Sequence, residues 1–129
     1  MISIRTLLAG MAGLVIAQAA CAHHSFAAFF DSEKMVTVTG TVTSYQFTNP
    51  HGLIAIDVRR PNGQIEHWRA ETNAPAVLMR RGWNRDTLKP GEVITINGWA
   101  SRDGKPYLRL RQATRANGKV IGIPFDTSG

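Results

Sequence analysis

Hydrophobic and polar residues alternate along much of this chain with a period of two, which is typical of half-buried β-strands. The first clear stretch starts at Val36 and reads VTVTGTVT, with β-branched residues at most positions. Gly40 interrupts this stretch. The hydrophobic residues stand at even-numbered positions up to Val42 and at odd-numbered positions from Tyr45 onward, so the phase of the alternation changes between them. This change of phase predicts a bend or a bulge within one long strand, and such a bend helps a small sheet to close on itself.

Four further alternating segments follow, and each is bounded by turn-forming residues such as Pro, Asn, Asp and Gly. They cover residues 53–60, 64–71, 92–101 and 107–114. Between the third and the fourth strand, Asn73 can cap a short helix that has Pro75 in its first turn and stops at Gly82. Residues 119–121 are a candidate for a sixth short strand.

The chain has 129 residues, of which 43% are hydrophobic, and this suits one ordinary globular domain. Three strands, a short helix and two further strands, in that order, are the elements of the OB-fold, a partly open Greek-key barrel. The sequence therefore predicts an all-β protein, a small OB-fold-like barrel of five to six strands with one short helix between strands 3 and 4.

The start of the chain differs from the rest, because one early cation, Arg5, precedes an uncharged apolar run that ends in small residues. The Ala20-Cys21-Ala22 sequence fits the small-x-small pattern at which signal peptidase cuts. Residues 1–22 are therefore predicted to be a secretory signal peptide. The alternative is a lipoprotein, in which a lipidated Cys21 is the first mature residue.

Cleavage after the leader leaves a mature domain of residues 23–129, in which residues 23–35 form an arm ahead of the first strand. The apolar run of the leader is shorter than the ~20 residues that a spanning helix needs, so we expect no transmembrane segment after cleavage and a periplasmic or secreted protein. The formal net charge of +6 becomes +5 once Arg5 is removed. A basic exported domain can meet anionic envelope surfaces or acidic ligands, although a solvated basic surface has the same composition.

Three segments carry motifs that can be compared with a known family: AHHSF within residues 22–31, TNPH within residues 36–58, and GW…LKPG within residues 80–104. With these motifs the chain resembles a family of small exported bacterial proteins of unknown function over nearly all of its mature length. The resemblance implies membership of that family and names no activity or cofactor. The chain departs from the family pattern at Cys21, which is why the lipoprotein alternative stays open.

Two of the four histidines, His23 and His24, stand at the predicted start of the mature chain. If His23 is the first residue, its α-amine and its imidazole can chelate one metal ion as a histidine brace, because the amine has a reference pKa of about 7.7 to 8 and loses its proton readily to a metal. A third nitrogen from His51 or His24 would complete the arrangement that Cu(II) prefers. We therefore expect copper at His23, His24 and His51. Zinc comes second, because the mature chain has no cysteine and no His-x-x-x-His pair.

Several of these residues also allow a purely structural interpretation. Asp31 is a candidate acceptor that orients a ligand imidazole, or a cap for the turn that follows it. The paired histidines fit a polar chain start equally well, and His51 fits a turn residue bonded to the backbone. Phe26, Phe29 and Phe30 are expected to plug the open side or end of the barrel, which would hold the first residues of the arm in place.

These observations lead to two hypotheses about function. The first is an exported metal-binding carrier or accessory protein, whose partners are a metal ion, copper before others, and another envelope protein. The alternative is an envelope module that binds an anionic ligand or a protein through a basic barrel face of Arg69, Trp99, Arg109 and Arg111, since the alternation points Arg109 and Arg111 outward. Export argues against nucleic acid as a partner. We expect no enzymatic activity, because the chain has no nucleophile elbow, no phosphate-binding glycine loop and no spaced acid–base pair.

Overall fold

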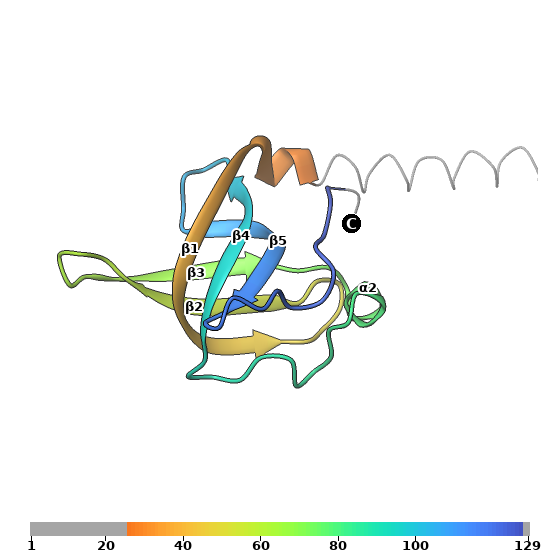
Figure 1. Ribbon diagram of the computed structural model, residues 1–129. Coiled ribbons are helices and arrows are strands. Elements are labelled where there is room, and N and C mark those ends of the chain that lie inside the picture. Colours follow the sequence, from red (N-terminus) through yellow and green to blue (C-terminus); the bar gives the residue numbers. More distant parts are fainter. Residues whose placement is uncertain (1–25, 128–129) are drawn as a thin grey trace, which may run out of the picture.

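The computed structural model describes residues 26–127 and has five strands and the helix α2. These elements are β1 (Phe30–Gln46), β2 (Leu53–Arg59), β3 (Ile65–Glu71), α2 (Pro75–Arg80), β4 (Val93–Ser101) and β5 (Tyr107–Arg115). The strands close into a barrel in the order β1-β2-β3-β5-β4 (Figure 1). All neighbouring strands are antiparallel except β3 and β5, which are parallel. The predicted all-β, OB-fold-like barrel with a helix between its third and fourth strands is confirmed.

The long strand β1 closes the barrel because its C-terminal half pairs with β2 and its N-terminal half pairs with β4. Its register with β2 shifts directly after Val42, where the change of hydrophobic phase predicts a bulge. Gly40 lies where the two pairings meet, and a Cβ there would stand 2.4 Å from the carbonyl oxygen of Asp57. Only glycine lets β1 pass this close to β2.

β1 starts at Phe30 rather than at Val36, so the arm of residues 23–35 ends earlier than the sequence predicts. The register with β4 is irregular between Phe30 and Met35. The intervening residues are polar and mostly exposed, and a hydrophobic pattern reports burial rather than backbone pairing. Ahead of the strand, residues 26–29 form a helical turn.

The helix α2 is shorter than expected and is not capped by Asn73. Its N-cap is Ala74, which makes no side-chain cap hydrogen bond, and Pro75 occupies the first turn as predicted. Asn73 is buried instead, with 3% of its surface exposed, and its backbone carbonyl accepts hydrogen bonds from Gly52 N and from Thr72 Oγ1. The segment before α2 is therefore held by contacts with the β1–β2 loop rather than by a helix cap.

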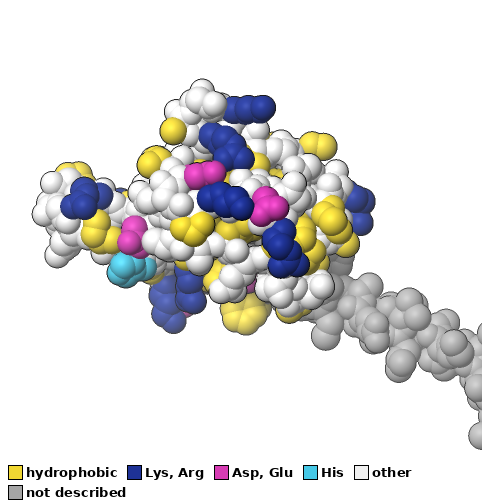
Figure 2. Space-filling view, turned by 90° about the horizontal axis from the view of Figure 1, so that it is seen from below, with side chains coloured by type: hydrophobic (Ala, Val, Ile, Leu, Met, Phe, Trp, Pro, Cys, Tyr) yellow, Lys and Arg dark blue, Asp and Glu magenta, His cyan; other side chains and the backbone are white. Residues whose placement is uncertain are grey.

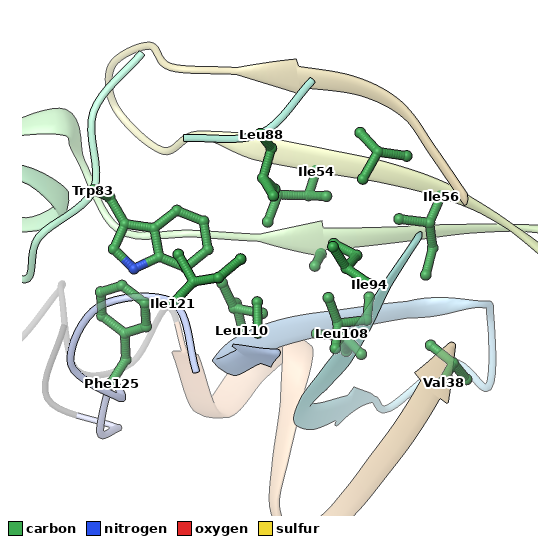
Figure 3. Packing of buried hydrophobic residues seen from close by; sticks show 14 of the residues in the cluster. Val38, Ile54, Ile56, Trp83, Leu88, Ile94, Leu108, Leu110, Ile121 and Phe125 are labelled. Carbon is green, nitrogen blue, oxygen red and sulfur yellow. The ribbon is translucent and has the colours of Figure 1, made fainter. Parts of the chain in front are cut away.

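The inside of the barrel is filled by buried aliphatic side chains from all five strands, with Ala70 as the member from β3. Figure 3 shows Val38, Ile56, Ile94 and Leu108 of the other four strands. One end is closed by Trp83 together with the C-terminal segment, whose Ile121 and Phe125 are buried. The ring centroids of Trp83 and Phe125 lie 6.2 Å apart. The expected sixth strand at residues 119–121 amounts to one bridge, between Thr114 and Val120. Among residues 26–127, no helix has the length and apolarity needed to cross a membrane.

Candidate functional site

A cluster of polar side chains lies where the parallel strands β3 and β5 run side by side. Glu71 of β3 and Arg109 of β5 are register partners, and their side chains meet on the outside of the barrel, with Arg109 Nη1 2.9 Å from Glu71 Oε1. Tyr107 donates its hydroxyl proton to Glu71 Oε2 at 2.6 Å. The carbonyl of Thr72 accepts a hydrogen bond from Arg109 Nη1 at 2.8 Å. With His51, these four residues form what we name the Arg109 cluster.

His51 reaches the cluster from the loop between β1 and β2. Its Nδ1 lies 3.2 Å from the Thr72 carbonyl oxygen and 3.2 Å from Arg109 Nη1. The neighbouring Gly52 makes this approach possible, because a Cβ there would stand 2.5 Å from Thr72 Oγ1. Backbone hydrogen bonds from Thr72 N to Gly52 O and from Gly52 N to Asn73 O tie the loop to the end of β3. The imidazole is thus held on one side and remains 45% exposed.

The charges of the cluster are unequally buried. Only 6% of the Arg109 side chain is exposed, against 23% of the Glu71 side chain. Burial lowers the pKa of the Arg109 guanidinium from its usual value, and the nearby Glu71 carboxylate opposes that shift. Burial and the hydrogen bond to Glu71 raise the pKa of Tyr107. The free-energy cost of burying the Arg109 charge is therefore offset by its contacts with one carboxylate and one carbonyl.

Aromatic rings cover the barrel next to the cluster. Phe26 packs edge-on against Trp99, with ring centroids 5.7 Å apart, and it also contacts Phe30. Phe30 in turn packs against Tyr107 at 5.4 Å. Of the three phenylalanines expected to plug the barrel, Phe26 and Phe30 pack on its outer surface, whereas Phe29 is 63% exposed. The first described residues are thus anchored beside β4 and β5.

The structure describes only some of the residues proposed for the metal site. His23 and His24 lie outside the described residues, and His51 belongs to the Arg109 cluster. Asp31 accepts a hydrogen bond from the backbone of Glu33 at 3.0 Å, which is the turn-capping role given as its second reading. Within residues 26–127, no group of three or more His, Cys, Asp or Glu side chains could hold a metal ion.

Two members of the expected basic face of Arg69, Trp99, Arg109 and Arg111 are covered in the structure. Arg109 points out of the barrel but is covered by the β1–β2 loop, and Trp99 is 7% exposed under Phe26. Arg69 and Arg111 are exposed. Strand alternation tells on which side of a sheet a residue lies, whereas a loop that covers that side is decided by the tertiary structure.

Glu71, Thr72 and Tyr107 were not among the site residues that the sequence suggested. The sequence holds one signal for two of them, which is the alternation of faces along a strand. Glu71 lies on the same face of β3 as Arg69, and Tyr107 lies on the same face of β5 as Arg109. Nothing local in either strand says that β3 and β5 become parallel neighbours. The pairing of Glu71 with Arg109 therefore follows from the closure of the barrel.

Comparison with known proteins identifies a family and a distant structural neighbour. No curated protein matches the sequence. The crystal structure of a small single-stranded DNA-binding protein from Streptomyces coelicolor is similar with a TM-score of 0.42 and 12% sequence identity, over 64% of this chain and 90% of that chain. That similarity is too low to carry an argument about what this chain binds. Residues 12–108 match DUF6152, a family of unknown function, and they include the AHHSF, TNPH and GW…LKPG motifs. Because this match spans well over half of the 129 residues, the chain belongs to the DUF6152 family.

Proposed function

We propose that this protein is an exported copper-binding carrier or accessory protein, and not an enzyme, whose metal site combines His23 and His24 with His51. The observation that carries the proposal is the way His51 is presented, with Nδ1 held by the protein while 45% of the side chain remains exposed. Imidazole nitrogen and a terminal amine are ligands that suit Cu(II).

The contacts of His51 Nδ1 fit a metal-binding histidine. Such a histidine binds through one ring nitrogen and donates the proton of the other to a carbonyl or a carboxylate. When Nδ1 of His51 carries the proton, the Thr72 carbonyl at 3.2 Å is its acceptor, and the lone pair of Nε2 is free for a metal. The contact with Arg109 belongs to the other tautomer, so metal binding would select the one that donates to Thr72. Arg109 also holds the Thr72 carbonyl, and it is therefore a positioning residue for His51.

The anchored start of the described chain gives further support. Phe26 packs on Trp99, Trp99 is the register partner of Arg109, and Arg109 contacts His51. His24 and His23 precede Phe26 by two and three residues, and an extended chain spans at most about 3.3–3.6 Å per residue. Because the arm is held at Phe26, His23 and His24 can reach only a limited distance from it. This tether lowers the conformational entropy lost when these histidines and His51 bind one ion.

The test is a native mass spectrum of the protein exported through its own leader and purified without chelator from copper-replete medium. We expect a chain that starts at His23 and retains one copper ion. His51→Ala should weaken copper binding by about 100-fold or more, whereas His67→Ala is the matched control and should leave it unchanged. His67 is also an exposed imidazole with its Nδ1 held by the protein, but it lies on β3 and its Nδ1 contacts Asp57 at 2.7 Å on the exposed face of the β2–β3 hairpin.

Three results would overturn the proposal. The first is a lipidated Cys21 as the mature N-terminus, which removes the free amine of His23. The second is a chain that starts at His23 and stays metal-free after copper is added. The third is a His51→Ala variant that binds copper as tightly as the unchanged protein while it keeps the native circular dichroism spectrum.

A further inference from the structure

The hairpin that joins β2 and β3 extends beyond the barrel. The last register pair between β1 and β2 is Thr41 with Asp57, and the pairing of β3 with β5 begins only at Arg69. Residues 59–68, which we name the hairpin arm, therefore lie past the last β1 pair and before the first β5 pair. Their tip projects from the body as a two-stranded ribbon (Figure 1), and at its base His67 and Trp68 pair with Asp57 and Ile56 of β2. Among the described residues, no strand lies along the β3 edge of the arm.

The free edge of β3 presents unpaired backbone groups in a known direction. The N–H of Arg69 points toward β5 and donates to the Pro106 carbonyl at 3.0 Å. Because backbone groups along an antiparallel strand alternate between its two edges, the N–H and C=O groups of His67 and Ile65 point the same way as those of Arg69. A third strand could thus continue along the arm where β5 stops.

The arm is held rigid by contacts on its opposite face. Arg60 donates two hydrogen bonds of 2.7 Å to the two carboxylate oxygens of Glu66, and Trp68 Nε1 donates to the same carboxylate at 2.8 Å. Trp68 also packs against the barrel core. A lone two-stranded hairpin is marginally stable in water, so these contacts keep the arm in a strand conformation without a third strand. Pre-organisation of this kind lowers the entropy cost of binding.

The outward face of the arm is basic and partly apolar. Arg59 lies across from Ile65, which is 39% exposed, and His67 and Arg69 follow on the same face of β3. The one acidic residue among these register pairs is Asp57, whose carboxylate lies 2.7 Å from His67 Nδ1. Arg59 and Arg69 make no ion pair with an acidic side chain in the described part of the chain. Figure 2 shows cationic and hydrophobic side chains together on the projecting part, with a histidine and an acidic side chain next to each other where it joins the body. Arginine and aliphatic groups on an open strand edge favour an acidic partner in extended conformation.

We propose that residues 65–68 of β3 form a docking edge for an acidic, extended segment of a partner protein, which adds to the sheet as a further strand. The partner's alternate side chains would lie beside Ile65 and His67 of β3, with Arg69 at the end of the docking edge and Arg59 one strand further away, within reach of a long acidic side chain. A second copy of this chain would bring like-charged arginines together at the same edge. Two arginines beside Asp57 are fewer than the about four to eight cations typical of lipid-binding clusters, so an anionic membrane fits the face less well. The docking edge does not involve the proposed copper ligands.

The test uses isotope-labelled exported protein, without metal, titrated with a short synthetic peptide in which Glu alternates with Val. We expect the amide signals of Ile65 and His67 to shift and their hydrogen exchange to slow. Ile65→Pro removes the outward N–H, which an edge strand tolerates, and should weaken binding by about tenfold or more, whereas Ile65→Val keeps the N–H and should bind normally. Arg59→Glu should also weaken binding, with Arg111→Glu as the control on another exposed surface.

Several outcomes would overturn the docking edge. One is equal binding of the acidic peptide and of a peptide with Lys in place of Glu. A second is undiminished binding of an acidic peptide that is N-methylated at alternate positions, a result that does not depend on how well Ile65→Pro folds. Binding to phosphatidylglycerol vesicles but not to the peptide would point to a membrane instead. A concentration-dependent shift of Ile65 and His67 without peptide would point to a second copy.

Discussion

The buried pair of Arg109 and Glu71 makes a quantitative prediction. We expect Arg109→Leu to lower the free energy of unfolding by about 3 kcal/mol. At the 2.9 Å separation and an effective dielectric constant of about 20, the attraction between the two charges is about 6 kcal/mol before desolvation is subtracted. Removal of one partner of a buried pair costs about 3–5 kcal/mol, and the lower end applies because Glu71 is 23% exposed and keeps its hydrogen bond to Tyr107.

Glu71→Leu should cost at least as much, because it leaves the 6% exposed guanidinium without its carboxylate. The double variant Arg109→Leu/Glu71→Leu should lose clearly less than the sum of the two, with a coupling of about 2 kcal/mol. Urea unfolding measures these changes, since a slope of about 1.5 kcal/mol per M converts a loss of about 3 kcal/mol into a midpoint shift of about 2 M. The control is Arg111→Leu on the same strand, which should change stability by less than about 0.5 kcal/mol.

The reasoning would be refuted if Arg109→Leu cost no more than Arg111→Leu, or if the losses of the two single variants simply added. A second readout connects the pair to the proposed copper site. Arg109→Leu should weaken copper binding by about tenfold, as expected for a group that positions a ligand, while Arg111→Leu should leave binding unchanged.

Further predictions at three positions concern pH and packing. Hydrogen bonds from Ser101 and from the backbone of Lys105 lower the pKa of Asp103 from 3.8 to about 2, and a carboxyl with a lowered pKa stabilises the fold only while it is ionised. Asp103→Asn should therefore be less stable than the unchanged protein near neutral pH, and urea titrations should show the two converge as the pH falls from 3.8 to about 2; a gap that persists below pH 2 would contradict this. Burial raises the pKa of Tyr45 from 10.0 to about 12, so the unchanged protein should lose stability relative to Tyr45→Phe as the pH rises through this range, because the unfolded phenol ionises first. Tyr45→Phe should also raise the free energy of unfolding by about 1 kcal/mol at neutral pH, because the buried hydroxyl has no hydrogen-bond partner among the described residues. A lower midpoint of thermal unfolding for this variant would contradict the prediction. Phe125→Ala should cost about 3 kcal/mol or more because it opens the barrel end beside Trp83, whereas Ile123→Ala, at a 57% exposed position, should be nearly neutral; equal losses would mean that the C-terminal segment does not close the core.

The sequence by itself determined the class of fold and most of its elements. Alternation with a period of two located all five strands, and the change of phase after Val42 located the bulge in β1. Pro75 and the apolar residues after it located α2. These features depend on residues near one another in the chain, and the burial of one strand face leaves a direct record in the pattern of hydrophobic positions.

Only the tertiary structure decided which outward residues are covered. The polar start of β1 at Phe30 left no hydrophobic pattern, because its pairing with β4 uses backbone groups that every residue carries. Arg109 lies on the outer side of β5, as alternation requires, yet the β1–β2 loop and the parallel neighbour Glu71 bury it. Contacts between segments far apart in the sequence depend on how the barrel closes, and local patterns do not record them.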